Sequence, residues 1–438
     1  MKYRQTDKVL MKSFLRHSII SILEWEAKLI VRKYKPKIIA VTGSVGKTST
    51  KDAIFSAVGK HLVARKSLKS FNSEIGVPLT ILGRDNAWGD PIRWIRVIVH
   101  GLILLLTRAH YPKWLILEIG AGKPGDIARV ARFIHPNIVV MTRIGDVPAH
   151  IEFFKSPKEL LEEKAEIIKG LGGNDMLVFN MDDERISSLR EKTKAKSISF
   201  GFSEGAMFRA SFAQVVYENG RPMGTTFKLE YDGNIFPVTM KGVVGIQSVY
   251  SALAACAVGA YVKTNIVDVI NALATHKSPP GRMRIIEGIK GATIIDDTYN
   301  SSPVAAHAAL DTFNHIVAKG RKIAILGDML ELGKFTIGEH AKLGTAAAFL
   351  DLLIVVGPRA KYVAEGALNG GLSEKNIIEF DDAQRAGKYL ENILHDGDMV
   401  LIKGSQVMRM ERAALEIMEH PERAQELLVR QEEEWKGR

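Results

Sequence analysis

The residues with the clearest capacity for chemistry lie at positions 41–48, which read Val-Thr-Gly-Ser-Val-Gly-Lys-Thr. Gly43 and Gly46 let backbone N–H groups turn toward phosphate oxygens, and a helix that begins here adds partial positive charge. Lys47 would reach the terminal phosphates of a nucleoside triphosphate, and the Thr48 hydroxyl would bind magnesium. The candidate nucleotide-binding residues of this loop are Gly43, Ser44, Gly46, Lys47, Thr48 and Ser49.

The setting of the loop favours phosphate binding over a glycine turn that a lysine follows by chance. Residues 38–41 are a β-branched run that is typical of a strand, and a helical pattern begins at Thr48. The general phosphate-loop motif has glycine at the position of Val41, so the match to that motif is incomplete. The sequence has no Asn/Thr-Lys-x-Asp segment of the kind that recognises guanine, which argues against a GTPase.

Composition limits the kind of protein that carries this loop. The chain has 438 residues, 46% hydrophobic and 25% charged, with a formal net charge of +11. Such a chain is long enough for two or three domains and too apolar to be disordered. Its single cysteine excludes a disulfide scaffold and indicates a reducing compartment, so we expect a cytoplasmic protein. The longest uncharged apolar run, residues 97–107, is too short to span a bilayer.

Strands that alternate with helices predict two α/β units with mostly parallel sheets. The expected strands are residues 38–41, 115–118, 138–141, 176–179, 293–295, 322–326, 352–356 and 399–402. Residues 206–241 instead alternate apolar and polar residues around Asn-Gly and Asp-Gly turns, which indicates antiparallel hairpins. Residues 278–281, Ser-Pro-Pro-Gly, form the clearest linker, and the pattern after them predicts a doubly wound, Rossmann-like domain.

We therefore expect an N-terminal basic amphipathic helix at 1–36, a central ATP-binding domain at 37–280 and a C-terminal domain at 281–438. A helix packed on the central domain is favoured for the first segment over one that rests on an anionic membrane surface. The apolar segment 92–106 is expected to form a buried or lid-like helix rather than a membrane contact. The tail after Glu411 is expected to be a charged, solvated helix.

Further motifs follow the phosphate loop in order along the chain. They lie at residues 72–78, 117–121, 125–127, 142–145, 150–153, 164–167, 281–283, 296–300, 326–333 and 403–405. Together with the loop at 42–50, they resemble the Mur ligase family, ATP-dependent enzymes that join an amino acid or peptide to a nucleotide-linked sugar peptide. The family's own shorter loop accounts for Val41. The string Gly-Asp-Met-Leu-Glu-Leu-Gly at 327–333 resembles the D-alanyl-D-alanine-adding branch.

The resemblance implies an ADP-forming ligase that activates a carboxylate as an acyl phosphate, which an amine then attacks. In such an enzyme Lys47 would serve phosphoryl transfer, and Glu118 would join Thr48 in holding Mg²⁺. His150 would hold a second Mg²⁺ with the help of Lys164, which would be carbamylated by carbon dioxide. Carbamylation needs a neutral amine, which a pocket that lowers the lysine pKa would favour. Taken alone, Glu118, His150 and Lys164 each have an ordinary structural explanation.

The resemblance also assigns residues of the second half to the nucleotide and the reacting centre. It implies that Arg282 meets ATP phosphates when the domains close, and that Asp297 and Tyr299 lie near the ribose and base. Asn300 would lie close to the reacting centre or the incoming dipeptide. Gln247 stands where the family has histidine on the adenine side, and it keeps the ability to hydrogen-bond a base edge.

The expected partners are ATP, a muramyl-peptide-like acceptor and a D-alanyl-D-alanine-like amine, bound by a monomer. We expect no nucleic-acid partner, because no aromatic cluster lies among the basic residues. Only about 36 residues precede the strand into the loop, too few for the family's usual uridine-nucleotide-binding first domain. We therefore expect that the acceptor is held differently or is not the usual one.

Two alternatives to this function follow from the same residues. One is a related ligase that acts on a lipid-linked or other non-UDP acceptor, with peripheral contact at the inner membrane face through residues 1–35. Its glutamate-amidating form needs a cysteine zinc site, which one cysteine cannot build. The alternative from another class is a non-catalytic nucleotide-binding scaffold. The joint presence of the loop lysine and the three candidate metal-site residues after it argues against a scaffold.

Overall fold

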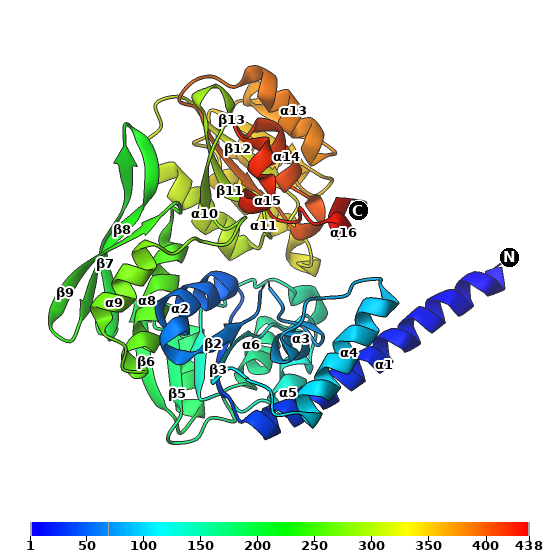
Figure 1. Ribbon diagram of the computed structural model, residues 1–438. Coiled ribbons are helices and arrows are strands. Elements are labelled where there is room, and N and C mark those ends of the chain that lie inside the picture. The colour runs from blue at the N-terminus through cyan, green and yellow to red at the C-terminus, as the bar shows by residue number, and fades with distance from the viewer. Residues whose placement is uncertain (1, 69, 437–438) are drawn as a thin grey trace.

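A computed structural model of the chain describes residues 2–68 and 70–436, and the side chains of residues 16–68 and 70–435. The chain folds into two lobes, each built around its own sheet, and a long N-terminal helix runs along the first lobe (Figure 1). The expected α/β class, with two mostly parallel sheets and a leading helix, is confirmed. The apolar and basic side chains of residues 2–15 lie outside the described side chains.

The first lobe contains a nine-stranded sheet. In spatial order its strands are β2 (Ala64–Lys66), β3 (Trp114–Glu118), β1 (Lys37–Thr42), β4 (Ile138–Met141), β5 (Met176–Asn180), β6 (Lys196–Gly201), β7 (Phe208–Glu218), β8 (Arg221–Tyr231) and β9 (Asn234–Lys241). The strands from β2 to β7 pair in parallel, and β7, β8 and β9 form the expected antiparallel hairpins. Strands β2 and β6 are not among the expected strands.

The second lobe contains a six-stranded sheet. Its strands in spatial order are β10 (Arg284–Glu287), β11 (Thr293–Asp297), β15 (Met399–Lys403), β12 (Lys322–Gly327), β13 (Leu352–Val356) and β14 (Ile377–Phe380). Only β10 runs antiparallel to its neighbour. Because alternate side chains of a strand point to opposite faces, Ala324 and Leu326 join the core shared with the first lobe, whereas Ile323 and Ile325 face the outer helices.

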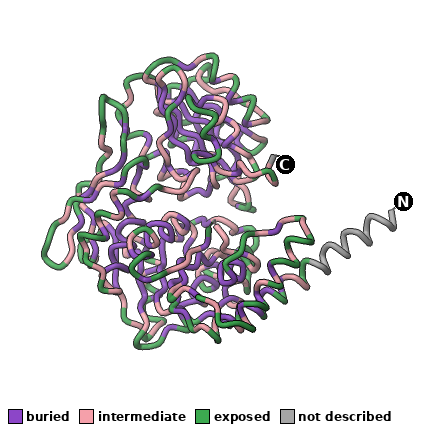
Figure 2. The backbone as a smooth tube through the Cα atoms, in the orientation of Figure 1, coloured by how far each residue is buried: buried purple, intermediate pink, exposed green. Residues whose placement is uncertain are grey.

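Helices cover the faces of both sheets, as parallel strands require. Those of the first lobe are α1 (Lys2–Tyr34), α2 (Lys47–Leu62), α3 (Gly76–Leu82), α4 (Pro91–Leu106), α5 (Asp126–Ala131), α6 (Pro157–Ala165), α7 (Glu184–Ser187), α8 (Ile246–Tyr261) and α9 (Ile266–Ala274). Those of the second are α10 (Pro303–His315), α11 (Thr336–Ala346), α12 (Lys361–Asn369), α13 (Ala383–Ile393), α14 (Glu411–Ile417), α15 (Ala424–Leu427) and α16 (Glu433–Lys436). Figure 2 shows that the buried backbone concentrates inside each lobe and where the lobes join.

Strand register places the candidate site at the carboxyl ends of the strands in each sheet. In the first sheet Val41 pairs with Glu118, so the phosphate loop begins beside the end of β3. In the second sheet Asp297 pairs with Lys403 at the ends of β11 and β15. Ligands bind at the carboxyl ends of strands in open parallel sheets. The two lobes therefore offer two such sets of strand ends to one site.

Helices α1 and α4 form a parallel pair on the outside of the first lobe (Figure 1). Glu26 of α1 lies opposite Gly101 of α4, where a Cβ atom would come within 2.3 Å of the glutamate Oε2. Further along, the Lys33 ammonium donates to the carbonyl oxygen of Leu104 over 2.8 Å. The Glu26 carboxyl is fully buried, and that burial raises its pKa to about 7. Close helix contact, rather than an ion pair, therefore holds α1 on the lobe at this point.

Residues 92–106 form a helix, as expected, but the expectation that this helix is buried is wrong. The segment forms α4, but only Val97, Gly101 and Leu104 of that helix are buried. Its other long aliphatic side chains are half-buried or exposed, because α4 lies on the outside of α1 and α3 with one side uncovered. No helix in the described part of the chain is both long enough and apolar enough to cross a membrane.

Candidate active site

The phosphate loop connects β1 to α2 and is fixed against the loop that follows β4. The backbone N–H of Ser44 donates to the carbonyl oxygen of Arg143 over 2.6 Å. Gly43 and Gly46 both have positive φ, 143° and 83°. A Cβ atom on Gly43 would lie 2.0 Å from the Thr142 hydroxyl oxygen, so this position admits only glycine. The loop thereby turns its backbone toward the N-terminus of α2, as a phosphate cradle requires.

Two lysine side chains converge on the mouth of this loop. The ammonium nitrogens of Lys47 and Lys164 lie 2.9 Å and 3.0 Å from the same acceptor, the carbonyl oxygen of Gly43. Burial lowers the pKa of Lys47, and Glu118 opposes that effect. Burial, and next the positive charge of Lys47, hold the pKa of Lys164 well below its usual value. A lowered pKa favours the neutral form of the Lys164 amine over the ammonium.

The carboxylate of Glu118, at the end of β3, has one oxygen that accepts no hydrogen bond from the described residues. Asn72 donates to Oε1 of Glu118 over 2.8 Å, and the ammonium of Lys51 lies 4.0 Å from Oε2. That Oε2 atom is buried and has no hydrogen-bond partner among the described residues. The hydroxyls of Thr48 and Ser70 lie 2.8 Å apart and complete this group of oxygens. Hard oxygen ligands of this kind suit Mg²⁺.

A metal held here would take few ligands from the protein. No cluster of three or more His, Cys, Asp or Glu side chains able to hold a metal occurs in the described part of the chain. Mg²⁺ commonly keeps several waters and binds through one or two protein oxygens plus substrate phosphates. The buried Glu118 oxygen that accepts no hydrogen bond, together with the hydroxyl of Thr48, fits that pattern.

His150 lines a cavity together with Lys47 and Lys164, and its side chain contacts a residue of the second lobe. Its Nδ1 atom contacts Oε2 of Glu331, and the Glu152 backbone N–H donates to the carbonyl oxygen of Glu331 over 3.1 Å. The contact with His150 lowers the pKa of the Glu331 carboxyl. The cavity, of about 380 Å³, is lined among others by Arg16, Ser44, Lys47, Asn72, His150 and Lys164. Three of the four residues expected to be catalytic thus share one cavity.

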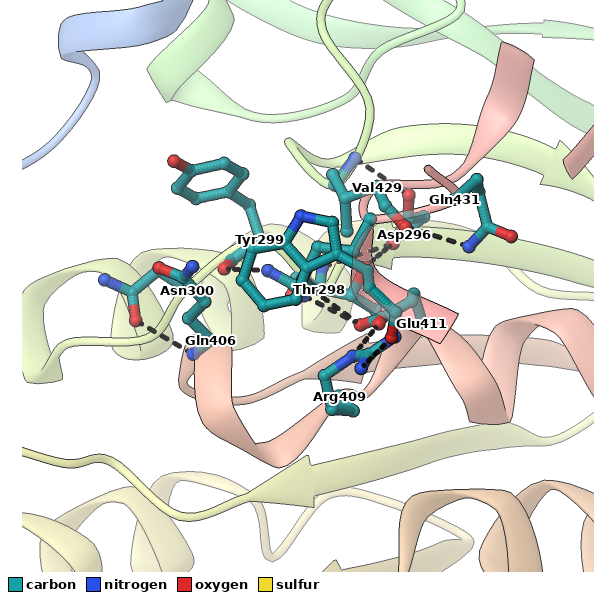
Figure 3. A network of polar contacts seen from close by, with 12 residues as sticks. Asp296, Thr298, Tyr299, Asn300, Gln406, Arg409, Glu411, Val429 and Gln431 are labelled. Atoms are coloured by element: carbon teal, nitrogen blue, oxygen red, sulfur yellow. Dashed lines mark hydrogen bonds and ion pairs between the residues drawn. The ribbon is translucent and has the colours of Figure 1, made fainter. Parts of the chain in front are cut away.

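The fourth, Asn300, points elsewhere. Its side-chain oxygen accepts from the backbone N–H of Gln406 over 3.3 Å, a contact within the second lobe (Figure 3). The backbone carbonyl oxygen of Asn300 accepts a hydrogen bond from the Lys403 ammonium over 3.0 Å. The same ammonium pairs with the buried carboxylate of Asp297. Burial raises the pKa of Asp297, and the positive charge of Lys403 opposes that effect. Lys403 therefore ties Asn300 and Asp297 together at the end of β15.

Arg282 joins the two lobes at the phosphate loop. Its guanidinium lies 3.9 Å from the centre of the Tyr299 ring, a cation–π contact, and donates to the Thr48 hydroxyl over 3.4 Å. Its Nε–H is buried and has no acceptor among the described residues. A planar cation placed against the loop with a donor to spare is suited to phosphate oxygens.

A second, narrower cavity lies between the phosphate loop and the second lobe. Its lining includes Gly46, Ser49, Gln247, Arg282, Asp297, Thr312 and Lys403. The side-chain nitrogen of Gln247 is buried there without a hydrogen-bond partner among the described residues. All of the nucleotide-binding residues expected outside the loop, except Tyr299, line this cavity. Its unpartnered donors, at Gln247 and Arg282, fit a nucleotide that lies across both lobes.

The tail of the chain supports the loop that carries Tyr299. Two arginines, Arg409 and Arg430, pair with the buried carboxylate of Glu411 (Figure 3). The Arg430 guanidinium also donates to the carbonyl oxygens of Thr298 and Tyr299, over 2.6 Å and 3.0 Å. The expectation of a solvated helix after Glu411 is therefore wrong. The described part of the tail forms three short α-helices. One of its charged residues, Arg430, is buried and holds the loop that carries Tyr299 in place.

Replacing Arg430 by alanine is expected to lower the free energy of unfolding by about 3 kcal/mol, because it leaves a buried carboxylate with one partner fewer and two carbonyl groups without a donor. Arg423→Ala is the matched control, since Arg423 is exposed and pairs only with Glu426 within the same tail. The control should cost less than about 1 kcal/mol. Urea unfolding of both variants measures the difference, and equal values would show that the Arg430 contacts do not support the fold.

The roles of several residues at the site could not be predicted from the sequence alone. Asn72 lies inside a family motif, but the resemblance assigns it no role. Lys51, one turn after Lys47 in α2, is fully buried. Lys403 lies in the motif at 403–405, and its pairing with Asp297 follows from strand register. Arg430 lies outside every motif.

Family models match two parts of the chain. The model described as the Mur ligase middle domain matches residues 98–259, and the model described as the Mur ligase, glutamate ligase domain matches residues 281–406. The second match begins at the expected linker, and the first covers the candidate residues at 118, 150 and 164.

Two curated relatives and one solved structure illustrate the similarity. The UDP-N-acetylmuramoyl-tripeptide–D-alanyl-D-alanine ligase of Bacillus subtilis is 27% identical over 92% of this chain and 80% of its own length. The ligase of the same name from Mycobacterium leprae is 30% identical over 84% of this chain and 71% of its own length. The crystal structure of MurF ligase from Thermotoga maritima in complex with ADP superposes with a TM-score of 0.74 at 28% identity, over 90% of this chain and 82% of that one.

Proposed function

The chain belongs to the Mur ligase family, and from that premise we propose that it joins a D-alanyl-D-alanine-like amine to the carboxylate of a muramyl-peptide acceptor. It is an ATP-dependent, ADP-forming amide ligase of peptidoglycan precursor synthesis. The named relatives add D-alanyl-D-alanine to a UDP-linked muramoyl-tripeptide, which supports the proposed pair of substrates.

The proposed reaction has two steps, because a carboxylate is a poor electrophile. An oxygen of the acceptor carboxylate attacks the γ-phosphorus of ATP, and the bond to the bridging oxygen breaks to release ADP. The amine then attacks the acyl carbon of the acyl phosphate, loses a proton and expels inorganic phosphate. Both steps place negative charge on oxygens that leave or rearrange. The protein's main task is therefore to supply fixed cations and to position the substrates.

The residues divide this task according to their places in the two lobes. We assign Lys47 to the phosphates, where its ammonium would exchange the carbonyl oxygen of Gly43 for phosphate oxygens. Arg282 would add its free Nε–H from the second lobe. Gln247, Asp297 and Tyr299 would orient the base and ribose. Asn300 would approach the reacting centre only after its contact with Gln406 is released.

Magnesium, which the family uses with ATP, would neutralise phosphate charge from a position held by Thr48 and Glu118. We propose a second metal position at His150 and a carbamylated Lys164. In this protein His150 would first leave Glu331, and Lys164 would first leave the carbonyl oxygen of Gly43. The lowered pKa of Lys164 supports its carbamylation, since only the neutral amine reacts with carbon dioxide.

One observation carries the proposal. Lys47 and Lys164, 117 positions apart in the sequence, meet at the carbonyl oxygen of Gly43. Arg282 of the other lobe donates to the hydroxyl of Thr48, the second residue of α2 after the same loop. A scaffold that only holds a nucleotide has no use for a second buried lysine at the phosphate cradle. Burying two lysine side chains next to each other is unfavourable, because each ammonium loses its water and the charge of Lys47 lowers the pKa of Lys164, and this cost indicates a chemical purpose.

The decisive experiment measures phosphate release from ATP with a panel of acceptors. Soluble UDP-linked and lipid-linked muramyl peptides would each be tested with and without D-alanyl-D-alanine. We expect release that needs both the acceptor and the dipeptide, together with a product whose mass is increased by the dipeptide. Release that depends on no member of the panel would refute the proposed substrates. We further propose that the protein acts as a monomer in the cytoplasm, with peripheral membrane contact that includes residues 1–35.

A further inference from the structure

The outer side of α4 carries an apolar stripe that remains largely exposed in the described part of the chain. Its members are Ile92, Ile95, Val99, Leu102, Ile103 and Leu106, with exposed fractions of 61%, 61%, 47%, 38%, 49% and 84%. Five of them recur at intervals of three and four residues and Ile103 adjoins Leu102, so all six lie along one side of the helix. The opposite side, with Val97, Gly101 and Leu104, packs inward. A surface helix normally has one apolar side, whereas α4 has two.

The neighbouring helix extends this exposed apolar surface. Ile22 and Trp25 of α1 are 39% and 52% exposed, although α1 also buries Leu23, Ala27 and Ile30. Tryptophan is enriched where proteins meet the interface between lipid and water. We call the α4 stripe together with Ile22 and Trp25 the α1–α4 face.

The charges of the two helices identify the occupant of this face. Their exposed charged residues within the described side chains are Arg16, Lys28, Arg32, Lys33, Arg93 and Arg96, all cations. Two of them form ion pairs with acidic residues outside the two helices, Arg16 with Glu74 and Arg93 with Asp90 and Glu434. Helix α4 has no acidic residue; in the described part of α1, Glu26 is buried and Glu24 pairs with Arg129. Two copies of the face brought together would oppose like charges, which disfavours self-association. An apolar stripe flanked by cations suits an anionic bilayer.

We propose that the α1–α4 face docks this protein on the surface of an anionic lipid bilayer, with α4 lying in the plane of the interface. The docking is peripheral, since none of the described helices can cross a bilayer. The inference identifies α4 as the main contact and does not depend on the reaction proposed above. It has one consequence for that reaction. Arg16, nine residues or about 14 Å along α1 from Trp25, lines the cavity of Lys47 and Lys164, so docking would hold that cavity near the lipid headgroups.

The test is co-sedimentation of the full chain with vesicles of phosphatidylcholine alone or mixed in equal parts with phosphatidylglycerol. We expect about tenfold or stronger binding to the anionic vesicles, reduced as salt rises from about 0.1 M to about 1 M. The double variant Ile95→Glu/Leu102→Glu should lose about tenfold or more of that binding. Both positions are exposed, so the fold should persist, which an unchanged unfolding midpoint would verify.

The matched control is Ile235→Glu/Val267→Glu. It adds the same two negative charges at exposed apolar positions of β9 and α9, away from the α1–α4 face, and should bind vesicles like the unaltered chain. Equal loss in both double variants would reduce the effect to net charge and overturn the proposal. Equal binding to neutral vesicles would overturn the anionic requirement. A dimer that the α4 variant dissociates, without vesicle binding, would assign the face to a second copy instead.

Discussion

Lys47→Ala is expected to lower the rate of ATP-dependent ligation by about 10³-fold or more, while the unfolding midpoint changes little. Lys47 is the first residue of α2, and its ammonium donates to the carbonyl oxygens of Gly43 and Ser44 within the loop itself. Charge-assisted donors that act on developing oxyanions contribute about 10²–10³-fold each in preorganised sites. The loss should be at the upper end of that range, because this lysine would face the transferred phosphoryl group.

The matched control for this variant lies on the same helix. Lys60 is exposed near the end of α2, so Lys60→Ala removes the same charge without touching the loop. It should leave the rate within about twofold of the unaltered enzyme. ADP release coupled to product detection measures both variants, and thermal unfolding shows that each is folded. If Lys47→Ala ligated as fast as Lys60→Ala, the phosphate role of the loop would be wrong.

The phosphate loop could be predicted from sequence because its function depends on residues close together in the chain. Two glycines, a lysine and a threonine within six positions, between a β-branched run and a helical pattern, leave few other structures. Most strands were likewise predictable, since strands buried on both faces appear as short apolar runs. The unexpected strand β6 lies inside the first sheet, whereas the other three unexpected strands, β2, β10 and β14, lie at sheet edges and are only partly buried. Their pairing depends on a neighbour rather than on their own residues.

The contacts that complete the site could not be predicted in this way. His150 and Glu331 lie 181 positions apart, and Arg430 lies 131 positions from the carbonyl of Tyr299 that it binds. No local pattern encodes such distances. The tail departs from the expectation because a charged composition normally indicates solvated residues, whereas the buried carboxylate of Glu411 pairs with both Arg409 and Arg430. The outer face of α4 was misjudged for the converse reason, since an apolar segment normally indicates burial.

Lys164→Ala is expected to reduce ligation by about 10²–10³-fold, and small carboxylates such as formate or acetate should restore part of the lost rate. The reason is the environment of the amine rather than its position alone. Lys164 is 3% exposed, lies beside the ammonium of Lys47 and has a pKa well below its usual value. A second cation is unfavourable at this place, whereas the carbamate that forms from the neutral amine is an anion. A carboxylate that enters the cavity left by the variant would replace that anion.

The unaltered enzyme provides an independent measurement of the same point. In buffer freed of carbon dioxide its rate should fall, and added bicarbonate should restore it. The gain from bicarbonate should increase as pH rises through the Lys164 pKa, because the proton must leave the amine before carbon dioxide can react with it. Lys169→Ala is the control, since Lys169 is exposed and forms an ion pair with Glu166 at the surface. It should retain both the rate and the response to bicarbonate.

The two measurements together separate a carbamate from a positioning cation. If Lys164 acted only as a cation that holds the carbonyl oxygen of Gly43, bicarbonate would have no effect and carboxylates would inhibit the alanine variant further. An amine in place of the carboxylate, such as ethylamine, would then rescue it. If the anion matters, the order is reversed, and formate succeeds where ethylamine fails. Because the two rescue agents carry opposite charges, the result identifies the charge that the site requires beside Lys47 during the reaction.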